Sequence, residues 1–314
     1  MTPAALDGIL NIDKPAGMTS HDVVASIRRL TGIKKAGHTG TLDPGATGVL
    51  PVCLGRATRL IRYLPDDKAY RAEVAFGVAT ATGDRFGEVI RTADASALTE
   101  EALLAALGHF QGPQEQIPPM TSAVRHQGKR LYELARQGLV VERQPRRVAI
   151  YELRLVSVSG LGAPTPRAVI ELTCSAGTYV RSLCMDLGEK LGCGAHMSAL
   201  VRTRAGAFGL ADSLTLDKIA EIHRQGDLSA VLTGLSEALA HLPAVPVKPA
   251  AEPAVKSGNR LYLPGVAAPG DEIARFASGQ PVRLLAGGEL LAVARKREDP
   301  TGKPYFQPET VLDW

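Results

Sequence analysis

Several signals that would place this 314-residue chain in a membrane or a metal-binding class are missing. No stretch approaches the roughly 18 uninterrupted apolar residues of a membrane span, and we expect no secretory signal before Asn11. The cysteines show no C-x-x-C spacing and no paired histidine, which argues against a zinc site and a disulfide framework. Buried thiols in a reducing cytoplasm are the expected alternative. The four cysteines are Cys53, Cys174, Cys184 and Cys193.

The motifs of common cofactor and hydrolase classes are also absent. There is no G-x-x-x-x-G-K-[ST] phosphate loop, no G-x-S-x-G nucleophile elbow and no H-E-x-x-H zinc motif. Gly160-Leu161-Gly162 lacks the third glycine of a dinucleotide fingerprint, and Pro164 stands where the helix would begin. An enzymatic function would therefore rely on side chains alone, and we predict neither a cofactor nor a metal.

A concentrated basic segment stands out on an otherwise nearly neutral chain. The formal net charge is +4, but residues 121–150 alone contribute +5, from seven Lys or Arg and two Glu. Such a segment is typical of a surface that binds a polyanion. A solvated helix face with i,i+4 ion pairs is the alternative interpretation. The apolar content of 45% and the length suffice for one large or two smaller domains with a real core.

Hydropathy patterns predict strands and helices that alternate without a regular βαβ rhythm. The expected helices are 21–31, 57–64, 98–110 and 178–191. The expected strands are 8–13, 49–54, 70–76, 87–91, 147–159 and 168–175. Segment 87–91 is expected to pair with 70–76, and Ser20 is the expected N-cap of the first helix. The sequence therefore predicts an α+β fold around a mixed, largely antiparallel sheet flanked by helices.

A change of composition after residue 242 predicts a domain boundary. Four prolines fall within 243–253, which is typical of a linker or boundary. Further on, apolar segments on both sides of Gly287-Gly288 predict a hairpin, and a third strand is expected from Tyr305. We therefore predict a main domain at 1–242 and a small β-rich domain at 246–314.

The most distinctive segment is a glycine-rich loop with a single carboxylate. Residues 37–48 read G-H-T-G-T-L-D-P-G-A-T-G, which is too rich in glycine for a regular helix or strand. Pro44 disfavours helical backbone at Asp43, so the aspartate should be extended with its side chain projecting from the turn. From spacing alone, an aspartate before proline is more often a turn former than a catalyst.

This loop closely resembles the catalytic motif of the TruB-type tRNA pseudouridine synthases. Further stretches resemble the same family in collinear order across residues 8–210. They are Asp13-Lys14-Pro15, Tyr70-Arg71, Ile117-Pro118-Pro119, 128–138, Gly177-Thr178-Tyr179-Val180-Arg181, 186–188, 192–196 and Leu200-Val201-Arg202-Thr203. Chance does not produce such an ordered series, so the resemblance identifies Asp43 as the expected catalytic residue.

The resemblance implies a pseudouridine synthase fold and a defined reaction, which converts the T-loop uridine of tRNA (position 55) to pseudouridine. The N1–C1′ bond breaks, the uracil turns, and C5 joins C1′, so the reaction is an isomerisation. An ionised Asp43 would add to the base or to the sugar, or remove a sugar proton, and the sequence leaves these routes open. The uridine must first flip out, because its reacting atoms are inaccessible in a stacked loop.

The resemblance also implies roles for five further side chains. Arg181 would pair with the aspartate and keep it charged in a pocket that excludes water. Tyr70 would stack on the target base, and Tyr179 would supply a hydroxyl for proton transfer at C5. Leu200 would pack against the base as an apolar wall, and His38 would fill the space that the flipped nucleotide vacates.

The basic segment resembles the family's thumb insertion, at about 113–147, which grips the T arm of tRNA through phosphate contacts. The predicted RNA-binding residues are Arg125, Lys129, Arg130, Arg136, Arg146 and Arg147. The region from 246 loosely resembles a small PUA-type RNA-binding domain. Two positions depart from the family pattern. Arg125 stands where the family more often has lysine, and Val201 stands where the family usually has arginine. Neither departure touches the predicted chemistry.

Other functions remain open at this level. A protein that assists tRNA folding without catalysis would carry the same basic segment. Guide-RNA-dependent relatives of the dyskerin type share the aspartate loop but lack the long thumb, so we expect a stand-alone monomer that uses tRNA as its partner, without guide RNA or membrane. A carboxylate glycosidase would need a second carboxylate, for which Asp84 is the nearby candidate.

Overall fold

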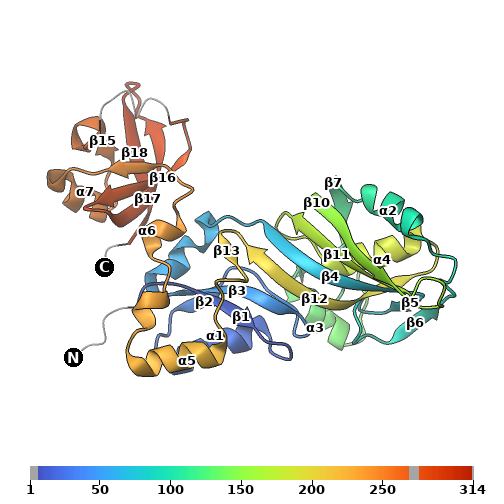
Figure 1. The fold of residues 1–314 in the computed structure, drawn as a ribbon. Helices are drawn as coiled ribbons and strands as arrows, with labels where there is room; N and C mark the ends of the chain where they lie inside the picture. The colour runs from blue at the N-terminus through green and yellow to red at the C-terminus, as the bar shows by residue number, and fades with distance from the viewer. Residues whose placement is uncertain (1–5, 269–275, 313–314) are drawn as a thin grey trace.

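The computed structural model describes residues 6–268 and 276–312, which form a larger part and a smaller C-terminal part (Figure 1). The larger part is built on a nine-stranded sheet in the order β1-β3-β12-β4-β11-β10-β7, with β2 added to β3 and β13 to β12. Its strands are β1 (Gly8–Lys14), β2 (Ala36–His38), β3 (Thr47–Leu54), β4 (Lys68–Phe76), β7 (Gly112–Gln116), β10 (Arg146–Ser159), β11 (Arg167–Cys174), β12 (Ala195–Ala205) and β13 (Phe208–Gly209). Only the β3–β12 pair is parallel among the described strands of this sheet, so the predicted mixed, largely antiparallel α+β fold is confirmed.

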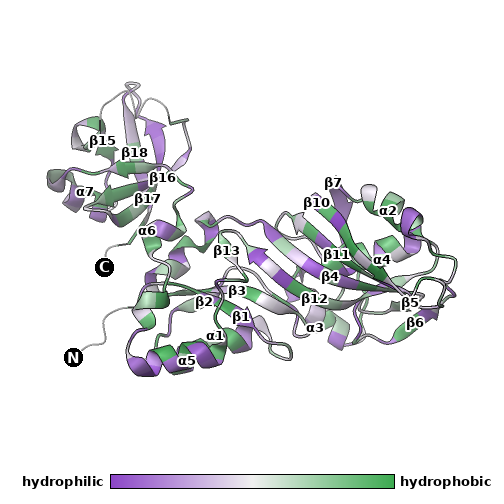
Figure 2. Ribbon diagram, in the orientation of Figure 1, coloured by the Kyte–Doolittle hydropathy of each residue, from purple (hydrophilic) through white to green (hydrophobic). Residues whose placement is uncertain are grey.

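Two pairs of helices bury the apolar side chains of this sheet. Helices α1 (Ser20–Thr31) and α5 (Leu216–Gln225) lie at one end, over β1 and β3, and share a core with them (Figure 1). Helices α2 (Glu100–Gly108) and α4 (Val180–Lys190) lie at the other end and share a core with β4, β11 and β12. Figure 2 shows hydrophobic and hydrophilic positions recurring along α5, as expected for a helix with one buried face. No helix in the described part of the chain is long and apolar enough to cross a membrane.

The first helix begins one residue differently from the prediction. Its N-cap is Thr19, whose side chain accepts a hydrogen bond from the backbone N–H of Asp22, while the Asp22 carboxylate accepts one from the Thr19 N–H. This reciprocal pair is a capping box and leaves Ser20 free for another contact. The Ser20 hydroxyl is buried and bonds to both backbone groups of Leu42, next to the aspartate of the glycine-rich loop.

Three local predictions are corrected by the structure. The 87–91 segment does not pair with β4, because β11 and β12 occupy both edges of that strand; instead β6 (Val89–Thr92) pairs with β5 (Val78–Thr80). The short helix expected at 57–64 is the 3₁₀ helix η1 (Gly55–Tyr63). The glycine-rich stretch is a loop only between β2 and β3, since its ends pair in those strands.

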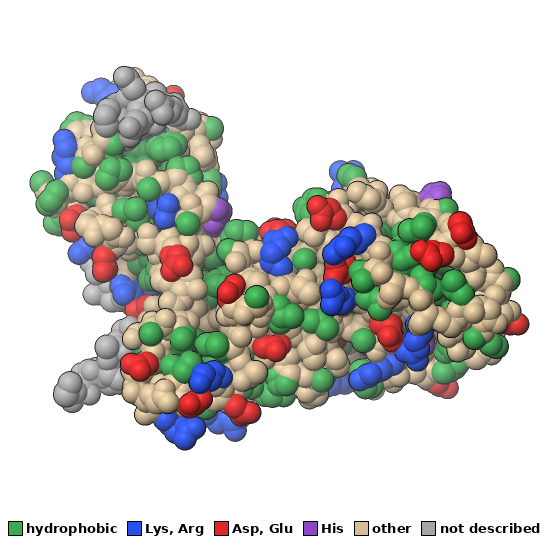
Figure 3. Space-filling model, viewed as in Figure 1, with side chains coloured by type: hydrophobic (Ala, Val, Ile, Leu, Met, Phe, Trp, Pro, Cys, Tyr) green, Lys and Arg blue, Asp and Glu red, His purple; other side chains and the backbone are tan. Residues whose placement is uncertain are grey.

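The basic segment leaves the main sheet between β7 and β10. It contains a small hairpin of β8 (Arg125–His126) and β9 (Lys129–Arg130), followed by helix α3 (Leu131–Arg136). Leu131 and Leu134 are buried, so one face of this short helix packs inward while its basic residue, Arg136, remains exposed. In Figure 3, Lys and Arg side chains gather along the edge of the larger part near α3.

The C-terminal part is a five-stranded sheet in the order β14-β16-β17-β18-β15, and the predicted hairpin and third strand are confirmed. Its strands are β14 (Ala244–Pro246), β15 (Leu261–Tyr262), β16 (Pro281–Ala286), β17 (Glu289–Glu298) and β18 (Pro304–Val311). The proline-rich stretch is not an extended linker, because β14 joins this sheet and the short helices η3 (Pro249–Ala251) and α7 (Glu252–Lys256) follow. The other short helices among the described residues are η2 (Leu228–Val231), α6 (Leu235–Ala238) and η4 (Leu263–Gly265).

An apolar core joins the two parts of the molecule. Leu60 and Tyr63 of η1 and Leu239 after α6 pack together with Val293 of β17 and with Leu312. The Tyr63 hydroxyl also lies 2.9 Å from the hydroxyl of a β18 threonine. Contacts of this kind fix the C-terminal sheet relative to the larger part.

Candidate active site

A cleft of about 1690 Å³ opens beside the glycine-rich loop. Its walls include the loop itself, strands β4 and β12, the connection between β5 and β6, the beginning of α4, and the basic segment around β8 and α3. All six predicted catalytic and substrate-binding residues line this cleft. They are His38, Asp43, Tyr70, Tyr179, Arg181 and Leu200. The fold thus brings together residues that lie up to 162 positions apart in the sequence.

Two buried side chains hold the loop that carries Asp43. Lys14, at the end of β1, is fully buried, and its Nζ donates a hydrogen bond of 3.3 Å to the Pro44 carbonyl. The Ser20 hydroxyl accepts a bond of 2.8 Å from the Leu42 N–H. Because the backbone groups of both neighbours, Leu42 and Pro44, are hydrogen-bonded to buried side chains, the backbone at Asp43 is held in place beside the cleft.

Asp43 and Arg181 form a two-point ion pair. Arg181 Nε lies 2.9 Å from Asp43 Oδ2, and Nη2 donates a bond of 3.1 Å to Oδ1. The guanidinium is buried, with 4% of the side chain exposed, whereas 34% of the aspartate side chain is exposed to the cleft. Arg181 also donates to the carbonyls of Thr82 and Thr121, at 3.1 and 3.0 Å, and to the Thr121 hydroxyl. The arginine is therefore locked in place and presents the carboxylate to the cleft.

Opposing effects act on the pKa of Asp43. Burial raises the pKa of its carboxyl above the ordinary value, the positive charge of Arg181 lowers it, and the nearby Asp84 carboxylate raises it again. Asp84 Oδ2 lies 3.8 Å from Arg181 Nη1, so two acids share one arginine. The net direction is upward, which makes the carboxylate more basic than a solvent-exposed aspartate.

Aromatic and apolar side chains form the remaining walls of the cleft. Tyr70 on β4 and Leu200 on β12 are 9% and 8% exposed, and they lie on neighbouring antiparallel strands. Burial raises the pKa of Tyr70, so its phenol remains neutral. Tyr179, the N-cap of α4, is held by Gln116, which accepts from its N–H at 2.7 Å and donates to its carbonyl at 2.9 Å.

His38 ends β2 at the rim of the same cleft. Its Nδ1 is buried and has no hydrogen-bond partner. Burial is the main cause that lowers the pKa of this imidazole, and Arg202 and His21 add to the effect. The ring is thus neutral, which suits packing against a nucleotide better than charge pairing.

The predicted RNA-binding residues divide into two groups in the structure. Arg125, Arg130 and Arg136 line the cleft, on the same side as Tyr132. Arg130 and Arg136 both stack on the Tyr132 ring, with guanidinium carbons 5.8 and 5.4 Å from its centroid. The other three do not line it and are exposed on β9 and β10: Lys129, Arg146 and Arg147.

Arg202 is a site residue that is not among the predicted ones. It is 1% exposed, and its guanidinium donates to the carbonyls of Val49 at 2.7 Å, Gly40 at 3.1 Å and Thr41 at 3.4 Å. It therefore ties β12 to both ends of the loop around Asp43. The only sequence signal was its place beside Leu200 in the last matching stretch, since hydrogen bonds across some 160 residues leave no local pattern.

The close approach of β12 also requires glycine at one position. Gly48 has φ of +99°, and a Cβ there would lie 2.3 Å from the Arg202 carbonyl oxygen. A larger residue would push β3 and β12 apart at the parallel pair Gly48–Arg202, just behind the loop.

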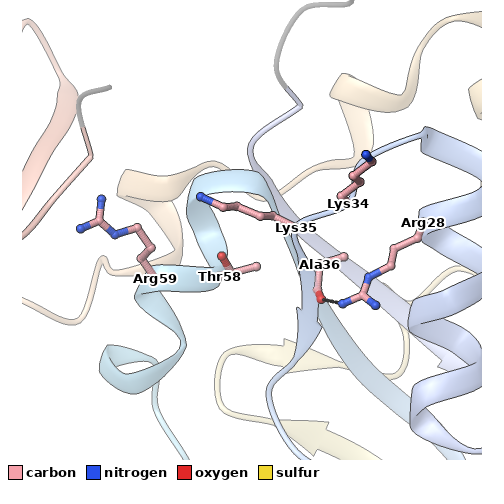
Figure 4. A pocket seen from close by; sticks show the side chains of 6 residues that line it. All are labelled: Arg28, Lys34, Lys35, Ala36, Thr58 and Arg59. Atoms are coloured by element: carbon pink, nitrogen blue, oxygen red, sulfur yellow. Dashed lines mark hydrogen bonds between the residues drawn. The ribbon is translucent and has the colours of Figure 1, made fainter.

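A second, smaller recess is basic but lies away from this cleft. Its volume is about 690 Å³, and it is found at the start of β2, the end opposite to His38 (Figure 4). Arg28 donates to the Ala36 carbonyl at 2.6 Å, and Arg59 to the Val311 carbonyl at 2.6 Å. These guanidinium groups hold backbone together, so we assign the recess no part in catalysis.

The described residues show no metal centre. No group of three or more His, Cys, Asp or Glu side chains is placed to hold an ion in this part of the chain. All four cysteines are buried free thiols, as expected from their spacing.

Comparison with known proteins gives one consistent result. Residues 28–180 match the family described as "TruB family pseudouridylate synthase (N terminal domain)", and residues 181–240 match "tRNA pseudouridylate synthase B C-terminal domain". The chain is 52% identical to the tRNA pseudouridine synthase B of Pelotomaculum thermopropionicum over 311 residues, 98% of this chain and 97% of the relative. It is 46% identical to that of Moorella thermoacetica over 312 residues, 97% of this chain and 99% of the relative.

Solved structures agree with this result. The chain superposes with a TM-score of 0.73 on a protein in the structure "Crystal Structure of a Cbf5-Nop10-Gar1 Complex", at 30% identity, over 98% of this chain and 85% of the other. A second match is "Structure of H/ACA RNP bound to a substrate RNA containing 2'-deoxyuridine", with a TM-score of 0.73 and 28% identity, over 98% of this chain and 86% of the other.

Proposed function

The chain belongs to the TruB family of tRNA pseudouridine synthases, and we propose that it isomerises the T-loop uridine of tRNA in the cleft at Asp43. The ion pair between Asp43 and Arg181 is the observation that carries this assignment. It combines a partly exposed carboxylate with a buried, fully engaged arginine inside a cleft large enough for a nucleotide and its neighbours. A carboxylate prepared in this way suits an isomerisation that needs one acidic group and no cofactor.

In the proposed reaction, the flipped uracil lies between the walls formed by Tyr70 and Leu200. The aromatic ring of Tyr70 offers a face on which any base can stack, and His38 occupies the space that the nucleotide leaves. Arg181 holds the Asp43 carboxylate toward the nucleotide as the N1–C1′ bond breaks. C5 then bonds to C1′, the C5 proton leaves, and N1 gains a proton, so no atom is lost overall. Tyr179 is the group we assign to proton transfer at C5.

The basic segment between β7 and β10 binds the T arm in this proposal. Three of its arginines, Arg125, Arg130 and Arg136, line the cleft, where phosphate contacts would position the RNA without reading its bases. The C-terminal sheet, treated as a PUA-like domain from about 246, provides a second RNA-binding surface. The apolar core behind η1 supports this role, because it holds that sheet at a fixed distance from the cleft.

We further propose that the enzyme acts alone, as a monomer, on cytoplasmic tRNA without a guide RNA. The long excursion of residues 117–145 supports this view, since it gives the protein its own grip on the RNA beside the catalytic loop. The solved neighbours from H/ACA complexes share the fold around the cleft but were solved as parts of larger assemblies.

The test is direct. The purified protein is incubated with a T-arm stem-loop RNA, with no other component, and pseudouridine is mapped at each uridine. We expect modification of the T-loop uridine alone. RNA binding without any pseudouridine would contradict the proposal and point to a tRNA-folding function instead.

A further inference from the structure

An exposed aromatic side chain stands at the mouth of the cleft on a rigid turn. Phe86 lies in the connection between β5 and β6, and 68% of its surface is exposed. The Asp84 carboxylate accepts hydrogen bonds from the Phe86 N–H at 3.0 Å and from the Thr82 hydroxyl at 2.7 Å. The Arg85 N–H donates to the Met197 carbonyl of β12 at 3.1 Å. The ring is therefore presented to solvent by a well-bonded backbone.

The Phe86 ring contacts the catalytic loop itself. A Cβ placed on Gly45 would lie 2.3 Å from Cε2 of the ring, so one edge of the phenyl group rests on backbone two residues beyond Asp43. Both Phe86 and Arg85 line the same cleft as Tyr70. Phe86 belongs to none of the apolar cores of the described residues but stands in the wall of the cleft, which favours a role toward the substrate over a role in packing.

Arg85 extends the ring into a larger stacking surface. Its guanidinium carbon lies 4.8 Å above the centroid of Phe86. A planar guanidinium over an aromatic face is the arrangement on which nucleotide bases stack, and its charge also favours RNA. A T-loop uridine that flips into the cleft leaves its neighbours with one unstacked face.

We propose that Phe86 and Arg85 form a stacking platform for a nucleotide directly adjacent to the target uridine. When the uridine flips, the adjacent base loses a stacking partner, and the platform replaces that partner. The platform thus holds the RNA at the cleft without contacting the reacting atoms. This inference rests on the proposed assignment of the Asp43 cleft as the uridine site.

The test separates stacking from simple packing by two substitutions with opposite expected effects. Phe86→Leu keeps apolar bulk against Gly45 but has no aromatic face, whereas Phe86→Trp keeps the face. In steady-state assays on a T-arm stem-loop, we expect Phe86→Leu to raise KM by roughly 5- to 150-fold, the usual range for one lost base stack. Its kcat should change by less than about twofold, because the lost contact is equal in ground and transition states. Phe86→Trp should keep the KM of the unaltered enzyme.

Two RNAs identify the nucleotide that stacks on the platform: one lacks the base on the 5′ side of the target uridine, and the other lacks the base on its 3′ side. The RNA that lacks the stacking base should have a higher KM than the intact RNA with the unaltered enzyme. With Phe86→Leu, the same abasic RNA and the intact RNA should have equal KM values, because the stack is already lost. The matched control is Ile90→Ala, since Ile90 is 63% exposed on the same hairpin and does not line the cleft. This control should leave KM unchanged.

Two results would overturn the inference. One is a KM that Phe86→Leu leaves within about twofold of the unaltered enzyme, where stack loss predicts more. The other is that each of the two abasic sites raises KM by the same factor in the unaltered enzyme and in Phe86→Leu. If instead the unaltered enzyme fails to modify the stem-loop, or Asp43→Asn retains its activity, the proposed function fails and not merely this platform.

Discussion

Arg181 Nε lies 2.9 Å from Asp43 Oδ2, and the two residues differ sharply in exposure. The arginine is almost wholly enclosed and bonded to Thr82 and Thr121, while a third of the aspartate side chain faces the cleft. A buried cation that cannot turn away makes the carboxylate an immobile, accessible anion. The relationship supports the proposal that this single aspartate on a glycine-rich loop is the reaction centre.

The pH dependence of the reaction should reveal the raised pKa of Asp43. Burial and Asp84 raise it above the ordinary value of 3.8, and Arg181 opposes them. Because the reaction needs the ionised form, kcat/KM should fall as the pH drops through this raised pKa, and the fall should begin above the range of an exposed aspartate. In Arg181→Met the opposing positive charge is lost, so the acid limb should move to still higher pH. An acid limb with an apparent pKa at or below the ordinary value of an aspartate would contradict this account.

Replacing Arg202 should loosen the catalytic loop and destabilise the protein. Arg202→Met leaves the buried carbonyl of Val49 and the partly buried carbonyls of Gly40 and Thr41 without their donor, at a cost of about 2–4 kcal/mol in the free energy of unfolding. Urea titration measures that loss, and kcat should decrease with it because the loop carries Asp43. The control is Arg204→Gln on the same strand, where an exposed ion pair to Asp67 is worth under about 1 kcal/mol. Equal losses in both variants would count against the role of Arg202.

The basic segment should act through charge. Arg130→Gln and Arg136→Gln should each weaken binding of a T-arm RNA and reduce the slope of log K against log salt, by about 0.7–0.9 for each lost phosphate contact. Fluorescence titration at several salt concentrations gives this slope. Lys218→Gln is the control, since Lys218 lies on α5, pairs with Glu221 and does not line the cleft. An unchanged slope in the two arginine variants would show that they do not contact phosphate.

Much of the architecture could be predicted because local patterns determine it. Segment 8–13 has the pattern of a short strand ended by Lys14-Pro15, α1 has apolar residues at helical spacing before Gly32, and a Gly287-Gly288 turn marks the C-terminal hairpin. All three elements are present. The ion pair between Asp43 of the glycine-rich loop and Arg181 was predicted from the family resemblance and is present, although spacing alone indicated only a turn at Asp43.

The errors concern partners that only the tertiary structure selects. Ser20 and Thr19 are equally good caps by type, and the choice depends on Leu42, which occupies the serine hydroxyl. The pairing of β6 depends on which strand edges β11 and β12 leave free. In the sequence, Arg202 cannot be distinguished from an ordinary arginine on a strand, because its hydrogen bonds to the loop carbonyls form only in the folded protein. Contacts of this kind have no local period, so the sequence pattern cannot reveal them.

The central claim is that Asp43 performs the chemistry, and a single-turnover measurement tests it most directly. Excess enzyme is mixed with labelled T-arm RNA, and pseudouridine formation and RNA binding are followed for the unaltered enzyme, Asp43→Asn and Asp67→Asn. Asp67 is the matched control, because its carboxylate pairs with Arg204 and does not line the cleft. We predict that Asp43→Asn binds the RNA but forms no pseudouridine, whereas Asp67→Asn remains active. Pseudouridine formation by Asp43→Asn at the rate of the unaltered enzyme would contradict the account.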